Sequence, residues 1–301
     1  MRATAVIIIT GISLLLSGCG AAKTSGPPAG AGQPRSTVTG QVPAGSVREL
    51  AALIASRIKS ADYPVIPPDS VVKYQSKEYY AAISNARTPQ AFTAFAVATR
   101  DVVVQPASSA RVNVVGYSPP RLVTSSERAR WQAAGRPPMP QVAVTGQAFS
   151  IPAGTYSFIP QGMPLTYRQV RSLPASSQAI SAQIAARLRP LAGARPPATA
   201  MMLQLGFLLA TAPLSRGARA AAWSALASLP GLRLCGPGRD LAGRAGQRLC
   251  ASTRTDQVDV LVDTGTGSVL AVDQHILQAS SWFPGVPVGS LVQSDAFLPR
   301  R

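Results

Sequence analysis

The chain has 301 residues, and its 29 Lys and Arg residues against 12 Asp and Glu give a formal net charge of +17 at pH 7. This length can bury a full hydrophobic core, as one large domain or as two small ones. The basic residues are mostly single arginines, without a run or interleaved aromatic side chains, so we expect no nucleic-acid partner.

The first 18 residues have the form of an export signal. Arg2 precedes an apolar run from Ala5 to Leu16 that is too short to span a bilayer as a helix. The following Leu16-Ser17-Gly18-Cys19 resembles the lipobox of bacterial lipoproteins, in which the cysteine is acylated and begins the mature chain. The resemblance implies loss of residues 1–18 and a lipid anchor at Cys19, on the extracytoplasmic side of the cell membrane. An ordinary secretory signal is the alternative.

A flexible tether is expected next, over residues 19–45. This stretch is rich in Gly, Ala, Pro, Ser and Thr and contains almost no large apolar residue, so it cannot offset its ordering entropy. Ser46 and Glu49 then have the spacing of a capping box, and apolar residues recur at helical spacing to about Ser60. We therefore expect the folded part to begin with a helix and to form a single α+β domain over residues 46–301.

Two cysteines remain once Cys19 is assigned to the anchor. Cys235 and Cys250 lie at symmetric positions around residues 240–244, so a hairpin would bring them together. An even pair in an oxidising compartment predicts a disulfide, worth about 3 kcal/mol for a loop of this size. Two free, reactive thiols are the alternative.

The rest of the chain alternates between strand and helix patterns. Residues rich in Val, Tyr, Phe and Thr predict an antiparallel meander, because no helix-sized spacer separates its strands, over about 71–83, 91–104, 111–123 and, with interruptions, 141–158. Helices are expected over 178–191, 198–211 and 215–229. Alternating apolar residues predict two further strands at 258–262 and 269–271, joined by a hairpin loop over 264–267.

The C-terminal half contains a set of short motifs: Leu173-Pro174, residues 213–232, Asp240 to Gly246, and Val262 to Leu270. Their order resembles a group of actinobacterial exported, membrane-tethered proteins of unknown function. The likeness covers about residues 165–277, with a fainter echo at 71–80. The architecture of that group is in turn similar to the lipoprotein-carrier half-barrels, which implies a curved antiparallel sheet wrapped around helices. The relatives usually carry a transmembrane helix near the N-terminus, where this chain has the lipobox.

One motif has the form of a catalytic signature. Leu261-Val262-Asp263-Thr264-Gly265-Thr266 matches the aspartic proteases, in which two aspartates share a proton. The chain contains the Asp-Thr-Gly motif once, so a catalytic pair would need a homodimer. A hairpin explains the same residues, because Asp favours a turn start and glycine tolerates positive φ. We therefore place an envelope aspartic protease acting through Asp263 third among the functions.

Other catalytic and metal sites receive little support. His275 is the single histidine, and the chain has no Gly-x-Ser-x-Gly elbow, which argues against a serine hydrolase. The same scarcity argues against zinc, and we expect no metal and no cofactor. Four aspartates could bind calcium weakly, but their spacing fits no calcium loop and solvated strand faces are the preferred interpretation: Asp256, Asp259, Asp263 and Asp273.

These observations predict a non-enzymatic binding protein of the cell envelope. The favoured hypothesis is an apolar pocket, between sheet and helices, for a lipid or another hydrophobic ligand. The alternative is a partner-binding or sensor module with a filled core. The sequence identifies neither the ligand-binding residues nor a protein partner.

Overall fold

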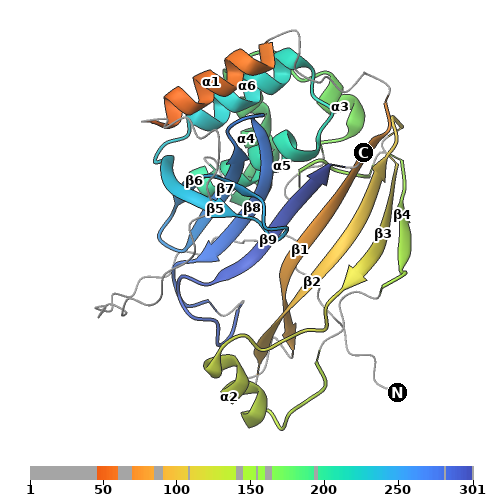
Figure 1. Ribbon diagram of the computed structural model, residues 1–301, viewed down its shortest axis with the longest axis vertical. Coiled ribbons are helices and arrows are strands. Elements are labelled where there is room, and N and C mark those ends of the chain that lie inside the picture. The colour runs from red at the N-terminus through yellow and green to blue at the C-terminus, as the bar shows by residue number, and fades with distance from the viewer. Residues whose placement is uncertain are drawn as a thin grey trace.

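A curved antiparallel sheet with helices packed over one end makes up the structure (Figure 1). The computed structural model describes residues 46–59, 70–84, 91–107, 109–139, 145–153, 155–159, 165–192, 196–280 and 283–299. The predicted α+β class with a curved antiparallel sheet is confirmed. The predicted signal at 1–18, the tether at 19–45 and Cys19 lie outside the described residues.

All neighbouring strands of the sheet are antiparallel, in the order β4-β3-β2-β1-β9-β8-β7-β6-β5. Because β9 lies between β1 and β8, it joins an N-terminal meander to a C-terminal one. The strands are β1 (Val72–Ser84), β2 (Phe92–Val104), β3 (Ala110–Tyr117), β4 (Ala148–Ile151), β5 (Arg233–Arg239), β6 (Ala245–Ser252), β7 (Asp256–Asp263), β8 (Ser268–Ile276) and β9 (Leu291–Pro299).

Five helices form what we call the helical layer: α1 (Val47–Lys59), α3 (Tyr167–Arg171), α4 (Ser177–Ala192), α5 (Ala198–Thr211) and α6 (Arg216–Ala227). Within this layer α5 lies on β6, β7 and β8, and α6 contacts α1, α4 and α5. The sheet face under α5 is called the inner face, and the opposite face the outer face. The remaining helix, α2 (Ser125–Ala133), lies at the far end of the sheet (Figure 1). Within the described residues, no helix is both long and apolar enough to cross a membrane.

The contact between α5 and the sheet is tight. A Cβ atom added to Gly206 of α5 would lie 2.8 Å from Val272 Cγ2 and 3.0 Å from Val260 Cγ2. Both valines are fully buried in β8 and β7. Glycine is therefore required here for close approach of the helix to the strands, and the space at this contact is filled by protein.

Several elements differ from the sequence prediction: β4 is shorter than the predicted strand over 141–158, and α2, α3 and β9 form where no helix or strand is predicted. The third predicted strand ends at Tyr117 because Pro119 and Pro120 follow, and proline has no N–H group for a strand ladder. Helix α2 then forms where no helix is predicted. It begins with a capping box in which Glu127 N donates to Thr124 Oγ1 at 3.1 Å and Thr124 N donates to Glu127 Oε2 at 2.8 Å.

Candidate functional site

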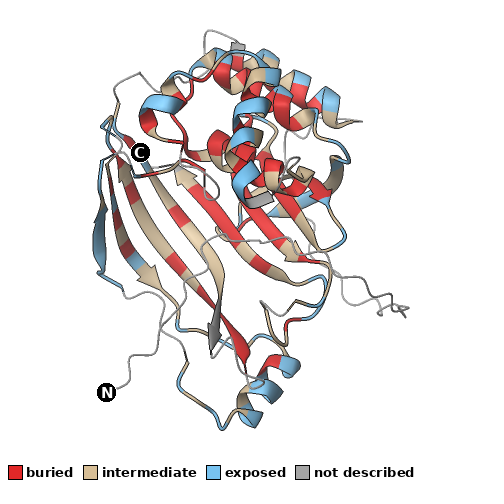
Figure 2. Ribbon diagram, turned by 180° about the vertical axis from the view of Figure 1, so that it is seen from behind, coloured by how far each residue is buried: buried red, intermediate tan, exposed pale blue. Residues whose placement is uncertain are grey.

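The inner face of the sheet continues past the helical layer. Strands β1, β2 and β3 run on toward α2 with no described helix over their inner face (Figure 2). Side chains of a strand alternate between faces, so the cross-strand register identifies those on this surface. Phe297 of β9 is on the inner face, because its ring packs edge-on against Phe207 of α5 with centroids 5.3 Å apart. Ser76 of β1 is paired with Phe297 and therefore shares that face.

The inner face of β1 changes from apolar to polar along the strand. Val72 belongs to the main core, and the Tyr74 hydroxyl lies 2.7 Å from the Tyr156 hydroxyl at the edge of that core. Burial raises the pKa of Tyr156 to about 12, so this pair stays neutral and closes the apolar layer. Beyond it, alternation places Glu78 and Tyr80 on the same face.

Glu78 forms an ion pair with Arg100 of β2, and each side chain is 18% exposed. The same carboxylate accepts a hydrogen bond from Ser76 Oγ at 2.9 Å. Partial burial makes such a pair costly to break, because removing one partner leaves the other charge without compensation. The ion pair therefore fixes a charged group in the middle of the uncovered inner face.

Asp295 of β9 lies directly opposite Glu78 and is 6% exposed. Gln293 Nε2 donates a hydrogen bond to Asp295 Oδ2 at 2.8 Å. Burial raises the pKa of Asp295 well above its ordinary value, and the neighbouring charge of Glu78 raises it further. Both causes favour the protonated form of the Asp295 carboxyl.

Two tyrosines border the ion pair. Tyr80 of β1 and Tyr117 of β3 both pack against Ala98 and Val114, and both are partly exposed. Burial raises the pKa of Tyr80, so its hydroxyl stays protonated at neutral pH. We call the surface made by Glu78, Tyr80, Arg100, Tyr117 and Asp295 the inner-face patch.

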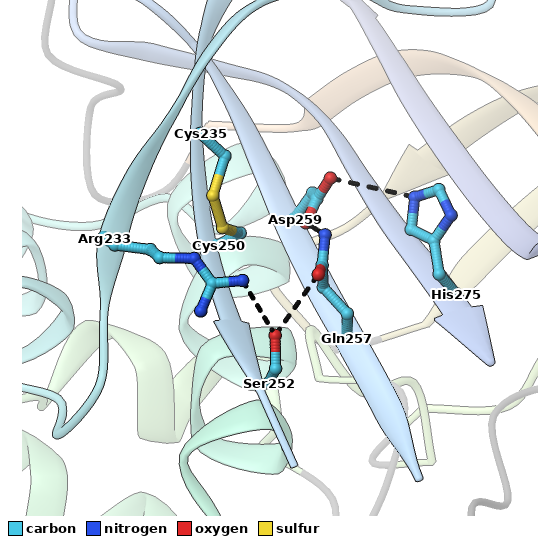
Figure 3. Close-up of a disulfide and its surroundings, with 7 residues drawn as sticks. All are labelled: Arg233, Cys235, Cys250, Ser252, Gln257, Asp259 and His275. Carbon is cyan, nitrogen blue, oxygen red and sulfur yellow. Dashed lines mark hydrogen bonds and ion pairs between the residues drawn. A yellow bond between two sulfur atoms is a disulfide. The ribbon is translucent and has the colours of Figure 1, made fainter. Parts of the chain in front are cut away.

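The outer face carries a second polar group, next to a disulfide (Figure 3). Cys235 and Cys250 are bonded, with their Cα atoms 6.0 Å apart. Beside them, Asp259 Oδ1 accepts a hydrogen bond from Gln257 Nε2 at 2.8 Å, and Asp259 Oδ2 lies 3.7 Å from His275 Nε2.

The expectation that the aspartates lie on solvated strand faces is wrong for two of them. Asp259 is 3% exposed and Asp273 is 9% exposed, and burial raises the pKa of Asp273. They face each other across β7 and β8, whereas Asp256 and Asp263 stand at opposite ends of β7. Within the described residues, no group of three or more potential ligands is arranged to hold a metal ion.

The Asp-Thr-Gly motif forms the turn between β7 and β8 and contacts α1. Asp263 Oδ1 accepts a hydrogen bond from Gly265 N at 2.8 Å, and Asp263 Oδ2 accepts one from Thr266 Oγ1 at 2.9 Å. Gly267 has a φ of +70°, and a Cβ added there would lie 2.7 Å from Ile54 Cγ2 of α1. Arg57 Nη1 of α1 donates to Gly265 O at 2.6 Å. These contacts account for the motif as a turn on which the first helix packs.

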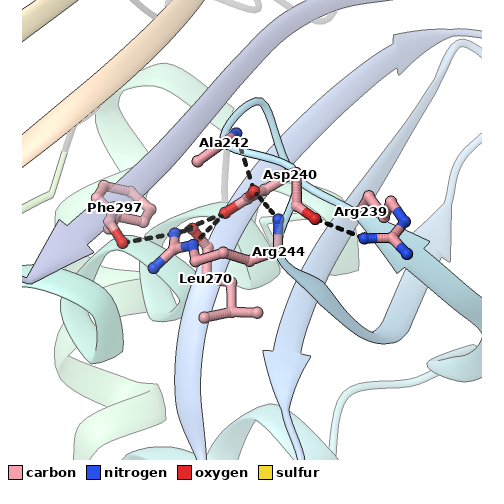
Figure 4. A network of polar contacts seen from close by, with 7 residues as sticks. Arg239, Asp240, Ala242, Arg244, Leu270 and Phe297 are labelled. Atoms are coloured by element: carbon pink, nitrogen blue, oxygen red, sulfur yellow. Dashed lines mark hydrogen bonds and ion pairs between the residues drawn. The ribbon is translucent and has the colours of Figure 1, made fainter. Parts of the chain in front are cut away.

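The Asp240 motif of the sequence analysis forms a polar network between strands (Figure 4). Asp240 Oδ2 accepts from Arg244 Nε at 2.7 Å, and Asp240 Oδ1 accepts from the amides of Ala242 and Arg244, each at 2.9 Å. Arg244 Nη2 also donates to Phe297 O at 2.7 Å and to Leu270 O at 3.1 Å. The network therefore ties the β5–β6 turn to β8 and β9.

Comparisons with known proteins give one similar structure. No protein-family model matches the sequence, and no curated protein matches it. A chain of the MucA/MucB complex of Pseudomonas aeruginosa is similar with 12% sequence identity and a TM-score of 0.24. The similarity covers 83% of this chain and 55% of that chain, so this chain spans about half the length of its match.

The residues that the sequence analysis singles out are distributed over several places. Cys235 and Cys250 lie together, Asp263 belongs to its own turn, and His275 is paired with Asp259. None of them belongs to the inner-face patch. That patch combines the consecutive strands β1, β2 and β3 with β9, which is far away in sequence, so no local motif indicates it. The alternation of Ser76, Glu78 and Tyr80 is a weak signal of one polar strand face.

Proposed function

We propose that this protein is an acyl-anchored envelope protein that binds a protein partner through the inner-face patch. The observation that carries the proposal is a polar and aromatic surface on strands that no described helix covers. Tyrosine and arginine are the residue types most enriched where protein interfaces bind tightly. The rigid sheet holds both types side by side.

The lipid-carrier hypothesis receives less support. The contact of α5 with β7 and β8 is filled at Gly206, and the uncovered part of the inner face is charged. An acyl chain laid on that surface would remove Glu78 and Arg100 from water without offering hydrogen bonds. A protein partner can satisfy these groups. A binding role without catalysis is consistent with the use of the Asp263 carboxylate inside its own turn.

The anchor at Cys19 is part of the proposal and depends on the lipobox sequence. Two or three acyl chains, each gaining about 0.8 kcal/mol per buried methylene, would hold the protein on the membrane. Replacing Cys19 by Ala and fractionating the cells tests this point. The anchor is wrong if the variant remains in the membrane fraction as the unchanged protein does.

Site-specific photo-crosslinking in the native host tests the binding surface. A photoreactive amino acid at Tyr117 should give a discrete crosslinked species, and Tyr80→Ala should weaken it strongly. Lys77→Ala is the matched control, because Lys77 lies on the outer face of the same strand, one register position from Glu78. Equal effects of both substitutions, or the same crosslink from a photoreactive group at Lys77, would contradict the proposal.

A further inference from the structure

The fold places many of the described positive charges in the helical layer, and a smaller group lies around α2, at Arg121, Arg128, Arg130 and Arg136 with Glu127. Along the sequence the arginines are scattered, but the described side chains of the helical layer contain eight arginines and one acidic residue. They are Arg48, Arg57, Arg168, Arg171, Arg187, Arg189, Arg216 and Arg219, with Glu49. The nine strands balance their charges instead. Their basic residues are Lys73, Lys77, Arg100, Arg111, Arg233, Arg239 and Arg248, and their acidic residues are Glu78, Asp101, Asp256, Asp259, Asp263, Asp273 and Asp295.

The surface of the helical layer is basic and lacks an apolar anchor. Arg48, Arg168 and Arg189 are exposed, and Arg171 donates to a neutral acceptor, Pro213 O, at 3.1 Å. The large apolar side chains that are exposed among the described residues all lie outside the helices, at Val71, Val115, Val123, Phe149 and Val288. Such a surface attracts an anionic partner by charge, without inserting side chains into it.

The place where the described chain begins indicates which anionic partner is bound. The described chain enters the fold at Ser46, directly before α1, so the segment from Cys19 joins the protein at the helical layer. An anchor at Cys19 would hold this layer close to a membrane at high local concentration. The choice of a lipid surface over a soluble polyanion therefore rests on the proposed function, which includes the anchor. The basic character of the helical layer is independent of that proposal.

We propose that the helical layer is a second binding surface, which docks on anionic lipid headgroups. Binding is electrostatic and superficial, and it leaves the inner-face patch at the other end of the sheet free for a partner. Each basic residue near an anionic membrane contributes about fivefold to the binding constant. Docking is lost at high salt, because the Debye length falls from about 10 Å at 0.1 M to about 3 Å at 1 M ionic strength.

Vesicle sedimentation tests this proposal without the acyl group. The protein is the chain that would remain after loss of residues 1–18, carrying Cys19→Ser, and the probes are vesicles of phosphatidylcholine with and without phosphatidylglycerol. We expect binding only to the vesicles that contain phosphatidylglycerol, and its loss at about 1 M salt. Three reversals in the helical layer should weaken binding at least about 100-fold: Arg48→Glu, Arg168→Glu and Arg189→Glu.

A second triple variant has the same net charge and serves as the control. Its substitutions lie at exposed arginines outside the layer: Arg111→Glu, Arg121→Glu and Arg128→Glu. Equal weakening by both variants would show that only net charge matters and would overturn the proposal. The proposal is also overturned if the protein does not bind the vesicles. In that case, heparin binding that is lost in the helical-layer variant would identify a soluble polyanion as the partner instead. Failure of the anchor appears separately, in the Cys19→Ala fractionation.

Discussion

Gly206→Ala tests whether the space between helix and sheet is filled. The added methyl group would lie 2.8 Å from Val272 and 3.0 Å from Val260, both of which are buried. Neither valine can turn away freely, because branched side chains in strands are stiff at χ1. Forcing a methyl group into such a contact costs about 1–3 kcal/mol. Alanine recovers about 1 kcal/mol relative to glycine inside a helix, so we expect a net loss of about 1 kcal/mol.

Urea unfolding of four proteins measures this effect: the unchanged chain, Gly206→Ala, Val272→Ala and the double variant. Val272→Ala removes the nearest contacting methyl groups, so the double variant should be more stable than the sum of the single effects by about 1 kcal/mol. A loosely packed layer or an apolar cavity makes the opposite prediction. In that case Gly206→Ala would gain about 1 kcal/mol from helix propensity and would show no coupling to Val272, which would refute our account of the packing.

Three further predictions concern stability. Burial raises the pKa of Asp295 above its ordinary 3.8, so above pH 3.8 the folded protein keeps a proton that the unfolded chain has lost. The free energy of unfolding therefore falls as the pH rises from 3.8 to the raised pKa. Asp295→Asn should therefore stabilise the protein at pH 7 and have little effect below pH 3.8, as measured by urea unfolding across pH. Gly267→Ala should destabilise the protein by about 1–3 kcal/mol more than Gly289→Ala. Both glycines have positive φ, but only an alanine at position 267 would contact α1. Equal losses of stability would contradict the packing of α1 on this turn. Reducing the Cys235–Cys250 disulfide, which closes a loop of 15 residues, should lower the free energy of unfolding by about 3 kcal/mol, and identical unfolding with and without reductant would contradict this.

Local sequence patterns predict most of the helices and several strands. The apolar spacing in α1, α4, α5 and α6 and the alternation in β7 locate these elements to within a few residues, whereas β8, predicted over 269–271, continues to Ile276. Helix α2 was missed although Thr124 and Glu127 have the capping-box spacing, because its remaining residues lack an apolar stripe.

Strand β9 was also missed, because its sequence lacks a simple alternation of apolar and polar residues. Residues 294–297 are buried on both faces of the strand, and the polar Ser294 and Asp295 are among them. Its pairing with β1 joins residues more than 200 positions apart, and no local signal reports such a contact. The inner-face patch depends on that pairing, which explains why the sequence analysis names none of its residues.

Organic extraction and mass spectrometry of the purified mature protein test the central claim most directly. If the helical layer is packed onto the sheet and the protein binds a partner at the inner-face patch, the extract contains no lipid in stoichiometric amount, because the acyl chains that we propose at Cys19 would be covalently bound and stay with the protein. A stoichiometric lipid that survives purification and is absent from the Gly206→Ala variant would contradict the account and favour a lipid carrier.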